Sequence, residues 1–138
     1  MKALVLAAAM VLGAMPVAAA EVQTAEGDWS NLPELRLAQR RVISPIMVGQ
    51  IHNLIVLGEC SIPGQNKKKL DMTVPFAVQF SPDGALERVV MKPVGCAQAE
   101  SILGGQVVEM IADGTFKRPK STVGEGWYKG EISFSSQT

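Results

Sequence analysis

Two cysteines, Cys60 and Cys96, and one histidine, His52, are the first residues to weigh for covalent or metal chemistry in this chain of 138 residues. In an exported protein the simplest interpretation of two cysteines is one disulfide bond. Two free thiols or half of a metal site are the alternatives. A zinc site takes about four ligands, and His52 is the only histidine. We therefore predict a Cys60–Cys96 disulfide, which would close a loop of about 37 residues and stabilise the fold by roughly 3–4 kcal/mol.

The usual catalytic constellations are missing from the sequence. Any Ser-His-Asp or Cys-His arrangement would have to use His52, which lies in an apolar stretch of helical spacing where a packed or surface histidine is commoner than a general base. A disulfide would leave no thiolate nucleophile. Gly124-Glu125-Gly126 lacks the lysine and the helix of a phosphate loop. The carboxylates are scattered over a turn, a strand and a helix, at Asp83, Glu87, Glu100 and Glu109. We therefore expect no enzyme, no metal and no cofactor.

Residues 1–20 have the pattern of a secretory signal peptide. Lys2 gives a positive start, Ala3 to Gly13 is apolar, and Ala18-Ala19-Ala20 offers an A-x-A cleavage site before Glu21. A retained membrane anchor is the alternative, although the apolar run is shorter than the roughly 20 residues of a spanning helix. Cleavage would remove 20 of 138 residues and one of 13 basic residues, leaving 118 residues with 12 basic against 13 acidic. That is enough for one domain, and its charge argues against nucleic acid as a partner.

Residues 21–43 show little apolar periodicity and are predicted to be a flexible N-terminal arm ahead of one domain, residues 44–138. Trp29 is the apolar exception and could dock on the domain, and Pro33–Arg41 could form a short helix. Ser44-Pro45 then supplies an N-cap and a first-turn proline, and Gly58 is a plausible stop. The apolar residues between them recur with helical spacing. We therefore predict a helix, with a strand as the alternative because residues 54–57 are continuously apolar.

The clearest pattern in the sequence runs from Leu70 to Phe80, where apolar residues alternate strictly with others. Six apolar side chains share one face, as in a half-buried strand: Leu70, Met72, Val74, Phe76, Val78 and Phe80. Ser81-Pro82-Asp83-Gly84 is a tight-turn sequence and Leu86–Lys92 is the returning strand, so these segments predict a β-hairpin. Pro75 cannot donate a ladder hydrogen bond. We expect regular pairing to begin at Phe76, with a bulge at Pro75 as the alternative.

A second helix and a last strand complete the pattern. Apolar residues from Ala99 to Ile111 recur with helical spacing, and Gly114 is the expected C-cap. Gly104-Gly105 inside this helix should cost about 1 kcal/mol per glycine relative to alanine, and indicates either a close approach to the sheet or a kink. Apolar residues alternate again from Tyr128 to Phe134. The order helix, hairpin, helix, strand is that of a small α+β domain.

The chain resembles the C-terminal domain of the TonB family, the periplasmic energy-coupling proteins of Gram-negative bacteria. The resemblance rests on Val78–Gly84, Leu86–Val90, Thr115–Pro119 and Trp127–Phe134, in that order and spacing. It implies a three-stranded antiparallel sheet with two helices packed on one face, and a periplasmic location. Family transducers carry a membrane anchor and a long proline-rich spacer. A cleavable signal and a short arm stand in their place here, so the resemblance implies a stand-alone TonB-like protein.

The resemblance also implies a function. The last strand of such a domain can accept an extended peptide from an outer-membrane receptor, because an edge strand has unpaired backbone N–H and C=O groups. The corresponding edge consists of Tyr128, Lys129, Gly130, Glu131, Ile132 and Ser133. We therefore expect a protein partner and no small-molecule cofactor. One alternative is a structural, envelope-maintenance protein that self-associates through this edge. Another is that Lys129 and Glu131 merely keep the edge soluble.

Overall fold

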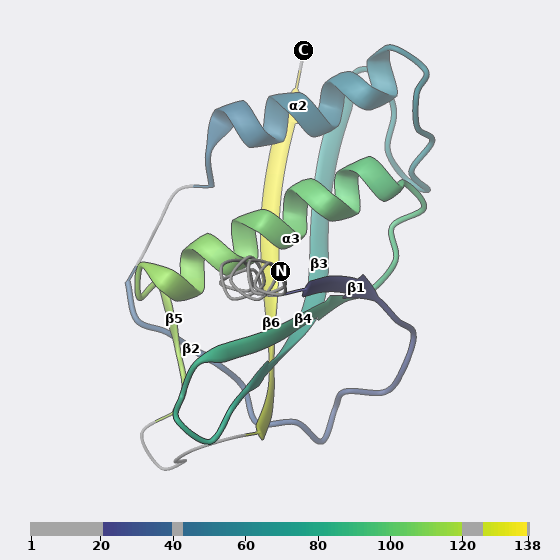
Figure 1. Cartoon of the computed structure of the whole chain (residues 1–138). Helices are drawn as coiled ribbons and strands as arrows, with labels where there is room; N and C mark the ends of the chain where they lie inside the picture. The colour runs from purple at the N-terminus through teal and green to yellow at the C-terminus, as the bar shows by residue number, and fades with distance from the viewer. Residues whose placement is uncertain (1–20, 40–42, 120–125, 138) are drawn as a thin grey trace, which may run out of the picture.

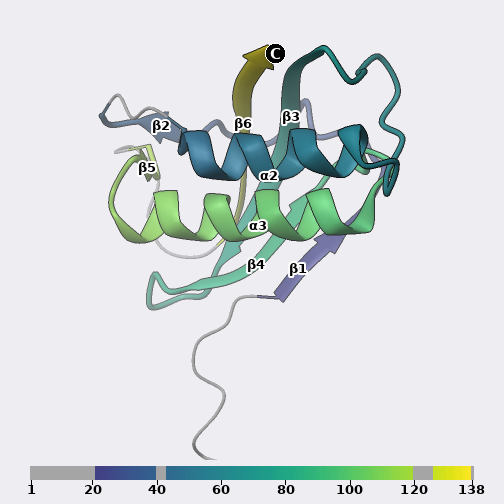
Figure 2. The same ribbon diagram turned by 90° about the horizontal axis from the view of Figure 1, so that it is seen from above.

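A computed structural model describes residues 21–39, 43–119 and 126–137, so the segment predicted to be a signal peptide lies outside the described residues. Two helices, α2 (Pro45–Val56) and α3 (Ala97–Ala112), lie side by side over one face of a sheet (Figures 1 and 2). The sheet has the order β1-β4-β3-β6, with bounds Glu21–Thr24, Leu86–Met91, Lys69–Phe80 and Gly126–Gln137. The predicted α+β class is confirmed.

The sheet differs from the expected one by one strand. β4, β3 and β6 form the expected antiparallel set, but β1 pairs in parallel with the outer side of β4, with Glu21 opposite Arg88. The prediction of a three-stranded, wholly antiparallel sheet is therefore wrong. The physical reason is that β4 would otherwise present a row of unpaired backbone groups, which the four residues of β1 satisfy. So short a strand shows no alternation by which it could be recognised.

β3 is the central strand that the alternation predicts. It pairs with β4 on one side and with β6 along its whole length on the other, from Lys69 opposite Gln137 to Phe80 opposite Gly126. Phe76 and Val78 are completely buried under the helices. The predicted turn follows, where Gly84 takes a φ of +90° and its N–H donates to the Ser81 carbonyl at 2.9 Å. The predicted hairpin is confirmed.

Pro75 is tolerated in this central strand because of where its nitrogen points. Its carbonyl accepts a hydrogen bond from the Lys92 N–H at 3.1 Å, so the Pro75 backbone faces β4. The ring nitrogen cannot donate in return, and the β3–β4 ladder begins one residue later, at Phe76 opposite Met91. On the other side Pro75 lies opposite Glu131 of β6 in an uninterrupted ladder. Regular hairpin pairing therefore begins at Phe76, as predicted.

The helix predictions are confirmed, apart from one. The Ser44 hydroxyl caps α2 by accepting from the Met47 N–H at 3.4 Å, which excludes the alternative of a strand in this stretch. The short helix suggested between residues 33 and 41 is wrong over its described residues. Arg36–Leu37 instead forms β2, which pairs antiparallel with β5 (Phe116–Lys117). The backbone groups that a helix would satisfy internally are thus bonded to other strands.

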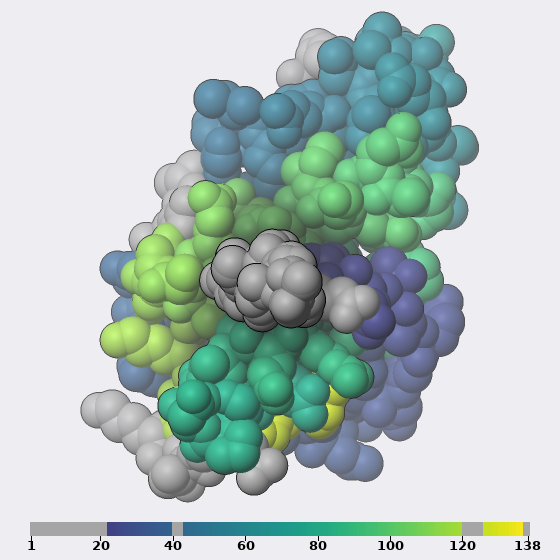
Figure 3. Space-filling view, viewed as in Figure 1, coloured from purple at the N-terminus to yellow at the C-terminus, as the bar shows by residue number. Residues whose placement is uncertain are grey.

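Gly104 lies where α3 comes close to the sheet. The strand that it meets is β1, which is not one of the three strands expected from the sequence. A methyl group built on Gly104 would lie 2.3 Å from Cγ1 of Val22, whereas one on Gly105 would meet nothing within 4 Å. Figure 3 shows β1 (purple) lying against α3 (green). α3 continues unbroken from Ala97 to Ala112 through both glycines. Of the two roles considered for the glycine pair, close approach therefore describes Gly104.

These two neighbouring glycines give opposite predictions. We expect Gly104→Ala to destabilise the protein by about 1–3 kcal/mol, because the methyl group must push Val22 and β1 away from α3. Gly105→Ala should stabilise it by about 0.5–1 kcal/mol, because the position is helical and open. Urea denaturation of both variants checks this. Equal effects of the two substitutions would show that β1 does not dock on Gly104.

Candidate partner-binding edge

Along β6, residues whose side chains face the core alternate with residues whose side chains lie on the open face of the sheet. Tyr128 and Ile132 are 3% and 2% exposed and face the core, and a Cβ on Gly130 would lie 2.6 Å from Cζ of Phe76. The side chains of Tyr128 and Ile132 are therefore not available to a partner, and Gly130 has none to offer. The alternate residues of β6 have side chains on the open face, where the hydroxyls of Ser133 and Thr73 lie 2.9 Å apart.

The backbone groups of β6 alternate as well. In an antiparallel ladder each residue directs its N–H and C=O to the same side, so successive residues bond to β3 and to the outside in turn. The direction is fixed at Lys129, whose N–H and C=O both bond to a segment outside the β3–β6 ladder. Gly130 and Ile132 therefore bond to β3, opposite Phe76 and Val74. The outward positions are Trp127, Lys129, Glu131, Ser133, Ser135 and Gln137.

The segment that bonds to Lys129 belongs to the N-terminal arm. Pro33–Leu35, which we call the strap, runs parallel to β6 in a single bridge between Glu34 and Lys129. The Lys129 N–H donates to the Pro33 carbonyl at 2.9 Å, and the Leu35 N–H donates to the Lys129 carbonyl at 2.8 Å. One outward position of the predicted partner-binding edge is thus already occupied by the chain itself.

The strap is held by one buried side chain and by its two backbone hydrogen bonds to Lys129. Leu35 is only 6% exposed and belongs to the hydrophobic core. Burial of a leucine contributes about 1.5–3 kcal/mol, and each of the two backbone hydrogen bonds contributes about 0.5–1.5 kcal/mol net. Glu34, between the two bonded residues, is exposed.

The arm reaches the strap by crossing the face of the sheet opposite the helices (Figure 1). It is guided by Lys92, whose ammonium lies 4.5 Å from the centre of the Trp29 ring and also bonds to the Gly27 carbonyl. The Lys129 ammonium donates to the Ser30 carbonyl at 3.3 Å. The expected docking of Trp29 is therefore seen. Residues 21–39 line both edges of the sheet, at β4 and at β6, although the sequence shows only an aperiodic polar segment there.

The electrostatic environment of this crossing is mixed. Hydrogen bonds from the hydroxyl and the amide of Ser30 lower the pKa of Asp28, and the nearby Lys92 and Lys129 lower it further. An open cavity of about 410 Å³ lies between this part of the arm and the sheet, with Trp29, Pro75 and Glu131 among its lining residues. Opposite charges are interspersed around it, so it does not select strongly for one sign of ligand.

Beyond Lys129, the outward side of β6 has no backbone partner among the described residues. No backbone hydrogen bond within residues 21–39, 43–119 and 126–137 reaches the outward groups of Glu131, Ser133 or Ser135. We call this stretch, Glu131–Ser135, the open edge. All three outward residues are exposed. It offers three N–H donors and three C=O acceptors in the spacing of a strand, which is the arrangement that strand addition requires.

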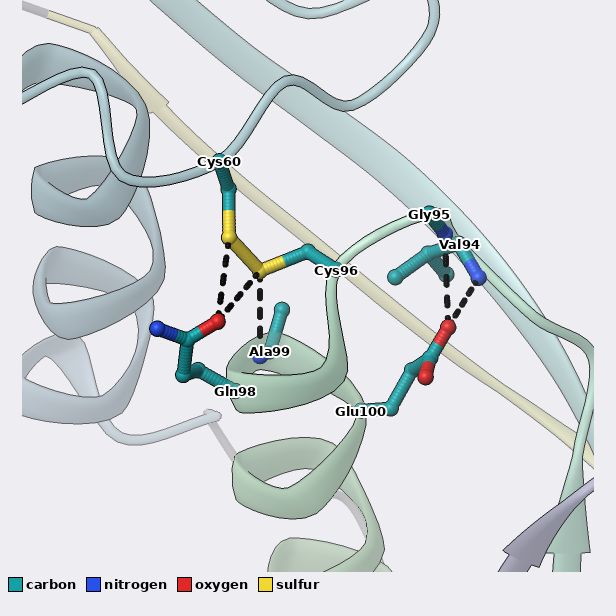
Figure 4. The surroundings of a disulfide bond; sticks show 7 residues. All are labelled: Cys60, Val94, Gly95, Cys96, Gln98, Ala99 and Glu100. Atoms are coloured by element: carbon teal, nitrogen blue, oxygen red, sulfur yellow. Dashed lines mark hydrogen bonds between the residues drawn. A yellow bond between two sulfur atoms is a disulfide. The ribbon is translucent and has the colours of Figure 1, made fainter.

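The predicted disulfide is present, and it connects residues that lie just beyond the end of α2 and just before the start of α3. Cys60 and Cys96 are bonded, with their Cα atoms 5.6 Å apart. Figure 4 shows that the Cys96 sulfur also accepts from the Ala99 N–H at 3.4 Å, and so caps α3. The carboxylate of Glu100 accepts from the Val94 N–H at 2.7 Å beside it. The bond therefore connects the segment after α2 to the first turn of α3.

The remaining chemistry-bearing residue, His52, is packed. It is 3% exposed, and its Nε2 lies 3.1 Å from the carbonyl of Asn66. Among the described residues no three His, Cys, Asp or Glu side chains gather as a metal site would need. In the same part of the chain, neither helix has the length and apolar character needed to cross a membrane. The comparisons with known proteins find no match to any family model, curated protein or solved structure.

Proposed function

We propose that this chain is an exported, periplasmic binding module, similar to the C-terminal domain of TonB, that pairs β6 with an extended segment of another envelope protein. The observation that supports it best is the open edge, where three outward residues in succession have no backbone partner among the described residues. Exposed strand edges of this kind are usually covered or blocked in proteins that do not use them. The disulfide is compatible with an oxidising compartment outside the cytoplasm.

We further propose which groups of β6 a partner would contact. Specificity for side chains would come from the open face, because the core-facing side of β6 is filled by Tyr128, Ile132 and Phe134. Affinity would come from main-chain hydrogen bonds at Glu131, Ser133 and Ser135. A partner would therefore be recognised first as an extended backbone of about five residues, which matches the length of the open edge.

A titration tests the proposal, in which the isotope-labelled mature chain, meaning the chain from Glu21 onward without the predicted signal peptide, is mixed with N-terminal peptides of outer-membrane receptors. We expect the amide resonances of Glu131, Ser133 and Ser135 to shift as peptide is added. Ser133→Pro should abolish the shifts at Glu131 and Ser135, because it removes the outward N–H between them while leaving the β3–β6 ladder intact. Ser133→Ala is the matched control, since it loses the hydroxyl contact with Thr73 but keeps the N–H. Absence of shifts at high peptide concentration would count against the proposal.

A second candidate function is self-association through the same edge in a structural, envelope-maintenance role. Residues 133–135 favour self-association, because they contain neither a charged residue nor a proline that would block pairing of the edge. Sedimentation over a range of protein concentrations separates the two candidates. A strict monomer at all concentrations would exclude self-association and leave the first proposal untouched.

A further inference from the structure

We propose that the strap is a built-in competitor for the β6 edge, so that a partner strand pairing along Trp127–Ser135 must first displace it. This inference rests on the proposed function, because it concerns the regulation of the same edge. It also assigns a role to the N-terminal arm, for which the sequence predicts only a flexible segment ahead of the domain.

The strap and a partner strand would use the same atoms. The strap bonds to both backbone groups of Lys129, which lies between the outward positions Trp127 and Glu131. While the strap is in place, a partner can continue only along Glu131, Ser133 and Ser135. With the strap displaced, Lys129 and Trp127 join them, so the pairing surface grows from three outward residues to five.

Displacement of the strap would expose Leu35 but would leave the β3–β6 ladder beneath it in place. The β3–β6 ladder is made by the alternate residues of β6, such as Gly130 and Ile132, and does not depend on the outward groups of Lys129. Of the three strap residues, Leu35 is deeply buried, whereas Glu34 is exposed. Burial of Leu35 is therefore the contribution to the equilibrium between the closed and open positions of the strap that a side-chain substitution can change.

Competition of this kind has a defined effect on binding. The apparent affinity of a partner that needs the whole edge is its intrinsic affinity multiplied by the fraction of molecules in which the strap is open. Any change that loosens the strap should therefore tighten the binding of such a partner. A change elsewhere in the arm that leaves Leu35 buried should not.

Leu35 and Leu37 provide a matched pair for the test. Leu35 is 6% exposed, whereas Leu37, two residues along the same arm, is 57% exposed. The probe is a synthetic peptide of the chain's own residues 30–38, because within the described residues this segment contains the strap that bonds to the outward side of β6. We expect Leu35→Ala to bind the peptide at least about tenfold more tightly than the unmodified chain, with shifts at the Lys129 amide. Leu37→Ala should bind it like the unmodified chain.

Two outcomes would overturn the inference, and they differ in what they say of the proposed function. If all three proteins bind the peptide equally at Glu131–Ser135, the edge accepts strands but the strap does not compete. If none of them shows shifts at Lys129 or at Glu131–Ser135, the inference fails together with the proposal of an edge-binding module. Leu35→Val, which keeps part of the buried side chain, should give an intermediate gain and serves if Leu35→Ala does not fold.

Discussion

Removal of the Cys60–Cys96 disulfide is expected to lower the free energy of unfolding by about 3–4 kcal/mol. The two cysteines are 36 residues apart in sequence, so the bond closes a long loop and restricts the unfolded chain. It also joins the segment after α2 to the cap of α3, two helices that pack side by side (Figure 4). Since small domains are stable by about 5–15 kcal/mol, the loss is a large part of the total.

Denaturation of the mature chain with and without reductant measures this loss, and two double variants separate its causes. Cys60→Ala with Cys96→Ser removes the bond but keeps an oxygen that can accept from the Ala99 N–H. Cys60→Ala with Cys96→Ala removes both, and should be less stable by about a further 1 kcal/mol because the α3 cap is lost. An unfolding free energy that does not change on reduction would contradict this account of the disulfide.

Gly130→Ala is expected to destabilise the protein by about 3 kcal/mol, near the upper end of the range for overpacked cores. The added methyl would lie 2.6 Å from Cζ of Phe76 and 3.1 Å from both Cε1 and Cε2 of the same ring. Phe76 is completely buried and meets the Phe116 ring edge to face at 5.3 Å, so it has little room to move. The backbone of β6 cannot retreat either, because Gly130 is bonded to β3.

A double-mutant cycle checks that this loss comes from the Gly130–Phe76 contact. Phe76→Leu shortens the side chain and should itself be destabilising, because it leaves a cavity. In combination with Gly130→Ala, the loss should be smaller than the sum of the two single losses by about 1 kcal/mol or more. Strict additivity would mean that the glycine is required for another reason.

Much of this fold could be predicted because its main elements carry local signals. The strict alternation from Leu70 to Phe80 follows from one buried and one open face of β3, and the Ser44-Pro45 pair follows from the chemistry of a helix start. The disulfide also followed from residue type, since two cysteines in a chain with a predicted export signal have few other uses. For the strand and the helix start, the residues that cause the structure are neighbours in the sequence, and for the disulfide the residue type alone indicates the bond.

The N-terminal arm could not be predicted in the same way. β1 has four residues and pairs with β4 more than 60 positions away, so its cause lies in the unpaired edge of β4 and not in its own sequence. The strap is likewise held by backbone bonds to Lys129, which any residue type could make. The signals available were isolated apolar residues in a polar segment, Val22, Trp29 and Leu35, each of which contacts the sheet or a helix.

The candidate site illustrates the same limit. The sequence places Tyr128 to Ser133 on one strand, and the alternation shows which side chains face the core. It does not show that the arm has taken the outward groups of Lys129, nor that the open edge continues past Ser133 to Ser135. The stretch of β6 without a backbone partner among the described residues is therefore Glu131–Ser135, and it lies closer to the C-terminus than the edge expected from the sequence.

Hydrogen exchange of the β6 amides in the mature chain tests most directly whether this edge is open. Glu131, Ser133 and Ser135 should exchange at least about tenfold faster than their neighbours bonded to β3, Gly130, Ile132 and Phe134. Lys129, whose N–H is held by the strap, should be protected although it also points outward. Uniform protection along β6 would show that the edge is already covered, and an unprotected Lys129 would show that the strap is not in place.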